Sequence, residues 1–206
     1  MLYFKVRTIL ETGDGKMLAL FCTDIRNADE HRARQKPRSP QKGSAFGVSL
    51  LEEAVGTVWQ MPLPEMTPPG HGKPGFVNDT EHFFSISHSK THVLVAVSDA
   101  PVGCDVETHR EISESSANSL MDEVEREQFN FFDLWCLREG LYKLNGAGNL
   151  REVLRFRRDG EKIIFPVPNV TGYLIPGIEG CSAIVCQERP FELPELQWVD
   201  VEKLYR

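Results

Sequence analysis

Short β-prone runs and a few helical segments follow one another in a mixed order, and this order constrains the fold more than any other feature of the chain. Apolar residues at helical spacing predict an amphipathic helix over 46–59, and a second long helix is predicted over 133–144, where Asn145-Gly146 ends it. Shorter helices are predicted within 113–132. Strands are predicted over 3–10, 17–21, 83–87, 93–98, 102–107, 153–158, 162–167, 171–175 and 181–186. Because strands and helices do not alternate strictly, we expect an α+β fold.

Turn signals mark two hairpins and one long loop. The Asp159-Gly160 pair and the 12–15 segment each lie between two β-prone runs and predict tight turns. The 61–75 segment is rich in proline and glycine and is therefore predicted to be a loop. Each half of the 206-residue chain holds several strands and a long helix, so we expect two α+β halves, 1–101 and 102–206.

One basic segment stands out from an acidic chain. The chain carries 23 Lys and Arg against 30 Asp and Glu, a net charge of −7, and this balance argues against a general nucleic-acid-binding protein. The segment 31–42, however, contains Arg32, Arg34, Lys36, Arg38 and Lys42 and no acid. Any role for this positive charge must therefore be local.

No segment predicts secretion or membrane insertion. Charged residues interrupt the N-terminal region, and the longest apolar run, 93–97, is far shorter than the ~20 residues that span a bilayer. The five cysteines form no CxxC pair, and most of them lie in apolar stretches, where a free thiol behaves as a small hydrophobe. We therefore expect a cytoplasmic protein that makes no membrane contact.

Two pairs of charged side chains are candidates for a catalytic site. One is a pair of acids on a strand, and the other is an acid and a lysine on a helix. On the strand over 102–107, Asp105 and Glu107 point to one face, whereas Cys104 and Val106 point to the other. On the helix over 133–144, Glu139 and Lys143 are four residues apart and share a face. If that helix packs beside the strand, three carboxylates and one ammonium group converge. Such oxygen ligands suit Mg²⁺ that also holds substrate phosphates.

Each of these pairs, taken alone, is more often an ordinary solvated surface. Two further patterns are weaker still. His88 and His92 have zinc-ligand spacing only on a helix, and their segment is β-prone. No nucleophile-elbow pattern surrounds Ser87 or Ser89, which leaves a serine triad without support. Walker and dinucleotide glycine signatures are also absent from the sequence, so nucleotide folds of those types are not indicated.

Four motifs taken in order are far more specific than any of these pairs. They are GKP at 72–74, FSISHS at 84–89, VGCDVE at 102–107 and WCLREGLYK at 135–143. Together they resemble the Sfp-type 4′-phosphopantetheinyl transferases, whose patterns are GKP, a stretch ending in SHS, (V/I)G(I/V)D(I/V)E and W-x-x-KE-x-x-x-K. The resemblance covers about 30–145.

This resemblance implies a fold, a reaction and a set of site residues. The fold is two similar α+β subdomains related by a pseudo-twofold axis, with the active site between them, which favours a monomer. The reaction is Mg²⁺-dependent transfer of the phosphopantetheine arm of coenzyme A to a serine of an acyl or peptidyl carrier protein, releasing adenosine 3′,5′-bisphosphate. The implied metal ligands are Asp105, Glu107 and Glu139; the implied catalytic residues are Glu139, Lys143 and His88; the implied coenzyme A contacts are His31, Arg32, Ser44, Lys73, Pro74, Ser87, His88 and Lys143.

The chain departs from the family pattern at several positions. Arg138 replaces the usual lysine before Glu139 and keeps the charge, and Gly140 stands where serine or alanine is usual. Gly43 lies where arginine is frequent and His31 where lysine is common, which bears on how the 3′-phosphate is bound. Two alternatives stay open: a non-catalytic binder of coenzyme A or of a carrier protein, and another metal-dependent phosphoester hydrolase.

Overall fold

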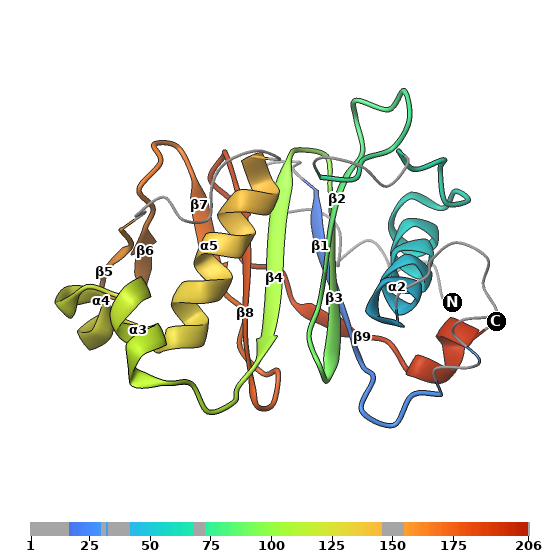
Figure 1. The fold of residues 1–206 in the computed structure, drawn as a ribbon. Helices are drawn as coiled ribbons and strands as arrows, with labels where there is room; N and C mark the ends of the chain where they lie inside the picture. Colours follow the sequence, from blue (N-terminus) through green and yellow to red (C-terminus); the bar gives the residue numbers. More distant parts are fainter. Residues whose placement is uncertain (1–16, 30–31, 33–41, 68–72, 146–154, 206) are drawn as a thin grey trace.

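The computed structural model describes residues 17–29, 32, 42–67, 73–145 and 155–205. Within them, two β-sheets pack face to face, and a long helix covers the outer face of each sheet (Figure 1). The order of layers is therefore helix, sheet, sheet, helix. The chain has a mixed α+β architecture, as the order of its predicted elements indicated.

The first sheet has four strands in the order β2-β3-β1-β9. β1 (Leu18–Asp24) and β2 (Phe83–His88) pair antiparallel with opposite edges of β3 (His92–Ser98). β9 (Leu196–Trp198) comes from the end of the chain and pairs parallel with β1. The C-terminal segment thus returns to the sheet built by the N-terminal half.

The second sheet has three strands in the order β4-β8-β7. β8 (Cys181–Gln187) pairs antiparallel with β4 (Val102–Thr108) and with β7 (Thr171–Leu174). A separate hairpin is formed by β5 (Arg157–Asp159) and β6 (Lys162–Ile164), and Gly160 in its turn has φ +60, a conformation that favours glycine.

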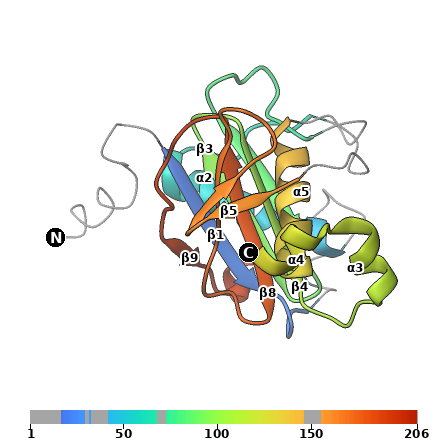
Figure 2. The ribbon, with the colours of Figure 1, turned by 90° about the vertical axis from the view of Figure 1, so that its left-hand side faces the viewer.

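The helices fall on opposite sides of this pair of sheets. α2 (Lys42–Trp59) lies against the first sheet, with the short 3₁₀ helix η1 (Val201–Tyr205) beside it. On the other side, α5 (Phe131–Asn145) lies against the second sheet, and α3 (Glu114–Leu120) and α4 (Glu123–Gln128) lie near its N-terminal end (Figure 2). In the described part of the chain, no helix is long and apolar enough to cross a membrane.

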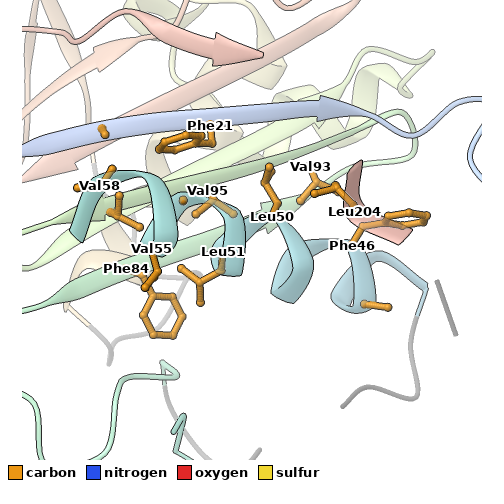
Figure 3. Packing of buried hydrophobic residues seen from close by; sticks show 14 of the residues in the cluster. Phe21, Phe46, Leu50, Leu51, Val55, Val58, Phe84, Val93, Val95 and Leu204 are labelled. Atoms are coloured by element: carbon orange, nitrogen blue, oxygen red, sulfur yellow. The ribbon is translucent and has the colours of Figure 1, made fainter. Parts of the chain in front are cut away.

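Strand alternation explains where the apolar cores lie. On β3, Val93, Val95 and Val97 pack against α2, as Figure 3 shows for Val93 and Val95 beside Leu50 and Leu51, whereas Leu94 and Ala96 fill the space between the two sheets. On β8, Val185 faces the first sheet and Ile184 faces α5. A sheet with helix on one side and sheet on the other buries both faces of its central strands.

The predicted elements are largely confirmed. The helices over 46–59 and 133–144, the short helices within 113–132 and the strands from 17 to 107 are present, with ends that differ by a few residues. The strands predicted over 153–158 and 162–167 are shorter, and β9 and η1 were not predicted. The strand predicted over 3–10 and the turn at 12–15 lie outside the described residues.

Candidate functional site

β4 carries the two acidic side chains whose facing was predicted. Cys104 and Val106 are buried in the core between the sheets. Asp105 pairs in register with Ile184, a residue of the core beneath α5, so its side chain lies on the face of the sheet that α5 covers. The predicted alternation is therefore confirmed, and the carboxylates lie on the side of the strand that the helix approaches.

α5 packs on β4 with almost no space between the two backbones. A Cβ built on Gly103 would lie 2.0 Å from the carbonyl oxygen of Gly140 and 2.8 Å from the amide nitrogen of Leu144. A Cβ built on Gly140 would lie 2.9 Å from Cγ2 of Ile184. Two glycines facing each other thus allow the helix to approach closely enough for its side chains to reach the acidic side of β4.

Lys143 on α5 forms an ion pair with Asp105 on β4. The Nζ of Lys143 lies 2.6 Å from Oδ1 of Asp105, and the two side chains are 25% and 5% exposed. Burial alone would lower the pKa of Lys143, but the charge and hydrogen bond of Asp105, together with Cys104 and Glu139, outweigh burial and raise that pKa. Lys143 therefore stays positively charged, although it lies largely inside the protein.

Glu139 lies close enough to Asp105, Lys143 and Glu107 for their charges to shift the pKa of its carboxyl. Burial and the negative charge of Asp105, with a smaller contribution from Glu107, raise the pKa of the Glu139 carboxyl above its usual value. Glu107 is paired with Arg110, whose Nη1 lies 3.1 Å from Oε2. Glu139 therefore lies near both members of the Lys143–Asp105 ion pair, and the negative charges of Asp105 and Glu107 both disfavour its ionised form.

These carboxylates fit a divalent cation in their chemistry, although they are not arranged as a complete metal cluster. Oδ2 of Asp105 is buried and accepts no hydrogen bond. An acceptor left without a donor in this way is costly unless a cation or water meets it. In the described residues, no group of three His, Cys, Asp or Glu side chains is gathered tightly enough to hold a metal ion by itself. The arrangement suits Mg²⁺, which takes one or two carboxylates and completes its octahedron with water and phosphate oxygens.

His88 ends β2 beside this charged group. Partial burial of the ring, followed by the positive charge of Lys143, lowers the pKa of His88 below its usual value. Asp105 and Glu107 act in the opposite direction. The imidazole is therefore mainly neutral near pH 7 and presents one N–H donor at the edge of the site.

A small cavity joins the predicted adenosine-end residues to the charged group. It has a volume of about 160 Å³ and is lined by Lys73, Pro74, Phe84, Ser85, Ile86, Tyr142 and Lys143. Lys73 donates a hydrogen bond to the carbonyl oxygen of Val102, and burial lowers the pKa of its ammonium group. The loop, β2 and α5 therefore meet at one place.

The predicted 3′-phosphate contacts are only partly described. His31 and the side chain of Ser44 lie outside the described residues, as does most of the 31–42 segment. Arg32 is described, and it faces η1: its Nη1 lies 3.1 Å from Oε2 of Glu202, and its guanidinium lies over the ring of Tyr205 at 4.0 Å. The described contacts of Arg32 therefore place it beside η1 and not beside the carboxylates of β4.

A larger hollow lies elsewhere and has the wrong charge for phosphate. It has a volume of about 560 Å³ and is lined by Ser49, Glu52, Glu53, Gly56, Thr57, Lys203 and Leu204, on α2 and η1. Two glutamates against one lysine do not favour an anion. The small cavity beside Lys143 is the better candidate, because its residues adjoin the carboxylates.

Some residues that shape the site were not predicted. Ser85 and Tyr142 line the small cavity; both lie inside the motifs FSISHS and WCLREGLYK, but neither was assigned a role. Ser182 on β8 donates a hydrogen bond to Asp133 and bonds Nε2 of His109, at 2.6 and 2.9 Å. This constellation is no catalytic triad, because the serine, not the histidine, is the group that contacts the aspartate. It ties the start of α5 to the second sheet.

Comparison with known proteins gives several relatives of one kind. The chain is 31% identical over 115 residues to the 4′-phosphopantetheinyl transferase psf-1 of Bacillus pumilus, a match over 50% of this chain and about half the length of that relative, 49%. It is 28% identical over 173 residues to the 4′-phosphopantetheinyl transferase AcpT of Salmonella typhi, covering 77% of this chain and 83% of the relative. AcpT of Escherichia coli O157:H7 is 26% identical over 182 residues, or 81% and 87%. No family model matches the chain.

Proposed function

We propose that this chain, which belongs to the 4′-phosphopantetheinyl transferase family, transfers the phosphopantetheine arm of coenzyme A to a serine of an acyl or peptidyl carrier protein. The observation that carries the proposal is the ion pair between Lys143 and Asp105 where α5 meets β4, with Glu139 close enough for both charges to act on its carboxyl. Carboxylates and a charged lysine together suit a substrate that brings both phosphate groups and a divalent cation.

In this proposal, the residues of the chain divide the work of positioning and proton transfer. The serine hydroxyl of the carrier attacks the phosphorus that bears the pantetheine arm, and adenosine 3′,5′-bisphosphate leaves. Lys143 neutralises negative charge on the pyrophosphate, and His88 donates a hydrogen bond to a phosphate oxygen. Glu139 accepts the proton of the serine.

Asp105, Glu107 and Glu139 would hold Mg²⁺ in this arrangement. Bound there, Mg²⁺ would neutralise the charge of the pyrophosphate oxygens and of the carboxylates that oppose one another. The buried Oδ2 of Asp105, which accepts no hydrogen bond, and the raised pKa of Glu139 support this assignment. Glu107 would have to exchange its contact with Arg110 for the metal.

Coenzyme A would approach the chain through its positive residues. Its phosphomonoester and pyrophosphate carry a charge on the order of −4, which a chain of net charge −7 repels unless cations are concentrated locally. Lys73 and Pro74 would line the adenosine end, and His31, Arg32 and Ser44 would contact the 3′-phosphate. For this, Arg32 would have to leave Glu202 and Tyr205.

We further propose that the halves 1–101 and 102–206 are related by a pseudo-twofold axis and act together as a monomer. The support is that each half supplies a sheet with a long helix on its outer face. We place the protein in the cytoplasm, because coenzyme A is made and used there and four of its five cysteines are buried free thiols.

A phosphopantetheine-transfer assay with a matched pair of variants tests the proposal. The chain is incubated with coenzyme A, Mg²⁺ and a panel of apo carrier proteins, and intact-mass spectrometry follows the mass of each carrier. Asp105→Asn should reduce the rate on the order of 10²–10³-fold, because it removes a charge at the reacting centre. Glu161→Gln removes one exposed charge on the β5–β6 turn and should have no effect.

The same assay separates the alternatives. Release of adenosine 3′,5′-bisphosphate with no gain of carrier mass would indicate a phosphoester hydrolase. Tight binding of coenzyme A in calorimetry without turnover would indicate a non-catalytic binder. Either result, obtained with carriers that a known transferase modifies, would refute the proposed reaction.

A further inference from the structure

Two strands that belong to different sheets lie side by side at the centre of the molecule. β2 is an edge strand of the first sheet, and β4 is an edge strand of the second (Figure 1). An edge strand leaves alternate backbone N–H groups without a partner in its own sheet. When such an edge is buried, each unpaired N–H group costs free energy unless another acceptor meets it.

Serine side chains of β2 supply those acceptors. The Oγ of Ser85 accepts a hydrogen bond from the N–H of Cys104 at 3.0 Å, and the Oγ of Ser87 accepts one from the N–H of Val106 at 3.2 Å. The two serines are two residues apart and therefore share a face of β2, and the amides of Cys104 and Val106, also two residues apart, point to the same edge of β4. Hydroxyl groups thus join the two sheets where no strand pairing exists.

Ser87 makes one contact that Ser85 does not make. Its hydroxyl donates to Oδ1 of Asp105 at 2.6 Å, and both residues are buried, with exposed fractions of 4% and 3%. The same Oδ1 also accepts from Lys143. Two donors on one oxygen set the rotation of the carboxylate and leave the other oxygen, Oδ2, without a donor.

We propose that Ser87 is a positioning residue, which orients the Asp105 carboxylate so that Oδ2 is kept for a divalent cation. The resemblance to the family placed Ser87 among the coenzyme A contacts. The described contacts instead commit its hydroxyl to Asp105 and Val106. This inference rests on the proposed function, because it assigns a role within the same metal and phosphate site.

Ser85 offers a matched control for the test. Ser85→Ala and Ser87→Ala each remove one hydroxyl that joins β2 to β4, and only Ser87→Ala also removes a donor to Asp105. Both variants should lower the urea midpoint of unfolding. Ser87→Thr keeps a hydroxyl group and serves as the conservative variant.

The measurement is Mn²⁺ binding, followed by electron paramagnetic resonance in the presence of coenzyme A, together with the Mg²⁺ dependence of transfer. Ser87→Ala should weaken Mn²⁺ affinity by about 10–100-fold, the usual effect of losing a group that orients a metal ligand. The concentration of Mg²⁺ needed for half-maximal transfer should rise in parallel. Ser85→Ala changes the lining of the small cavity but removes no donor to Asp105, so the Mn²⁺ affinity should stay near that of the unaltered chain. Ser87→Thr should restore both values.

Two results would overturn the inference in distinguishable ways. If the unaltered chain transfers phosphopantetheine but both alanine variants weaken Mn²⁺ binding equally, Ser87 merely joins the sheets. If the unaltered chain neither binds Mn²⁺ with coenzyme A nor modifies any carrier, the proposed function itself fails, and the assigned role of Ser87 fails with it.

Discussion

The close approach of α5 to β4 makes Gly103→Ala the most informative substitution in the chain. The added Cβ would lie 2.0 Å from the carbonyl oxygen of Gly140, whereas ordinary contact begins at about 3.4 Å, so the helix would have to move by about 1.4 Å. The atoms nearest to the added Cβ belong to the backbone of Gly140 and Leu144, and no side-chain rotation can relieve the contact. A shift of this size would also separate Lys143 from Asp105, which are 2.6 Å apart.

The cost follows from these two effects together. Overpacking a core costs about 1–3 kcal/mol, and a lost hydrogen bond to a charged group costs about 1.5–3 kcal/mol. We expect Gly103→Ala to lose about 2.5–6 kcal/mol, which is a large part of the 5–15 kcal/mol that usually holds a domain folded. Urea denaturation followed by circular dichroism measures the loss, and the phosphopantetheine-transfer assay should detect no transfer.

Two further glycine substitutions serve as controls for this reasoning. A Cβ on Gly56, in the last turn of α2, meets nothing within 4 Å, so Gly56→Ala should stabilise the protein by up to about 1 kcal/mol through helix propensity alone. A Cβ on Gly140 meets mainly the side chain of Ile184, which can move, and Gly140→Ala should cost about 1–3 kcal/mol. A Gly103→Ala protein with the stability and activity of the unaltered chain would refute the close packing of α5 on β4.

Two other predictions concern the charged groups that surround α4. Glu125 is fully buried and binds Nη1 of Arg155 at 2.9 Å and the N–H of Phe156 at 3.0 Å, so Glu125→Gln should cost about 3–5 kcal/mol in urea denaturation. A loss of stability below about 1 kcal/mol would show that the ion pair of Glu125 contributes no more than a surface salt bridge, and would contradict this prediction. Asp122 caps α4: the N–H of Glu125, and then the side chain of Arg157, lower the pKa of its carboxyl. Because this pKa is lower in the folded protein, its stabilising effect is present above the unfolded value near 4 and is lost as the pH falls through the folded value. The difference in Tm between the unaltered chain and Asp122→Asn should therefore shrink between pH 5 and pH 2.5, and a constant difference would contradict the assignment.

Most of the secondary structure could be predicted from the local periodicity of the sequence. The alternation of apolar and acidic residues along 102–107 predicted which side chains of β4 face the core and which face α5, because side-chain direction in a strand depends only on position. The Asp159-Gly160 turn was predicted for a similar reason, since its left-handed glycine is a local requirement. β9 was missed because three residues, Leu196–Trp198, are too few to display a period.

The residues of the candidate site could likewise be predicted from the sequence only in part. The ordered motifs identified Asp105, Glu107, Glu139 and Lys143 as candidates, because each motif is a short stretch of chain. The sequence could not assign the hydroxyl of Ser87 to the Asp105 carboxylate, since that contact joins residues of two different sheets. It also could not place Arg32 against Glu202, which follows 170 residues later in the chain.

The sequence by itself therefore determined the kinds of element, the faces of the strands and the residue types that carry the proposed chemistry. Only the tertiary structure decided that Gly103 and Gly140 bring α5 onto β4, that Lys143 shares one oxygen of Asp105 with Ser87, and that the other oxygen is left without a donor. The reason is physical. Burial and side-chain direction repeat with the local period of a helix or strand, whereas the distance between two elements depends on how all their side chains pack together.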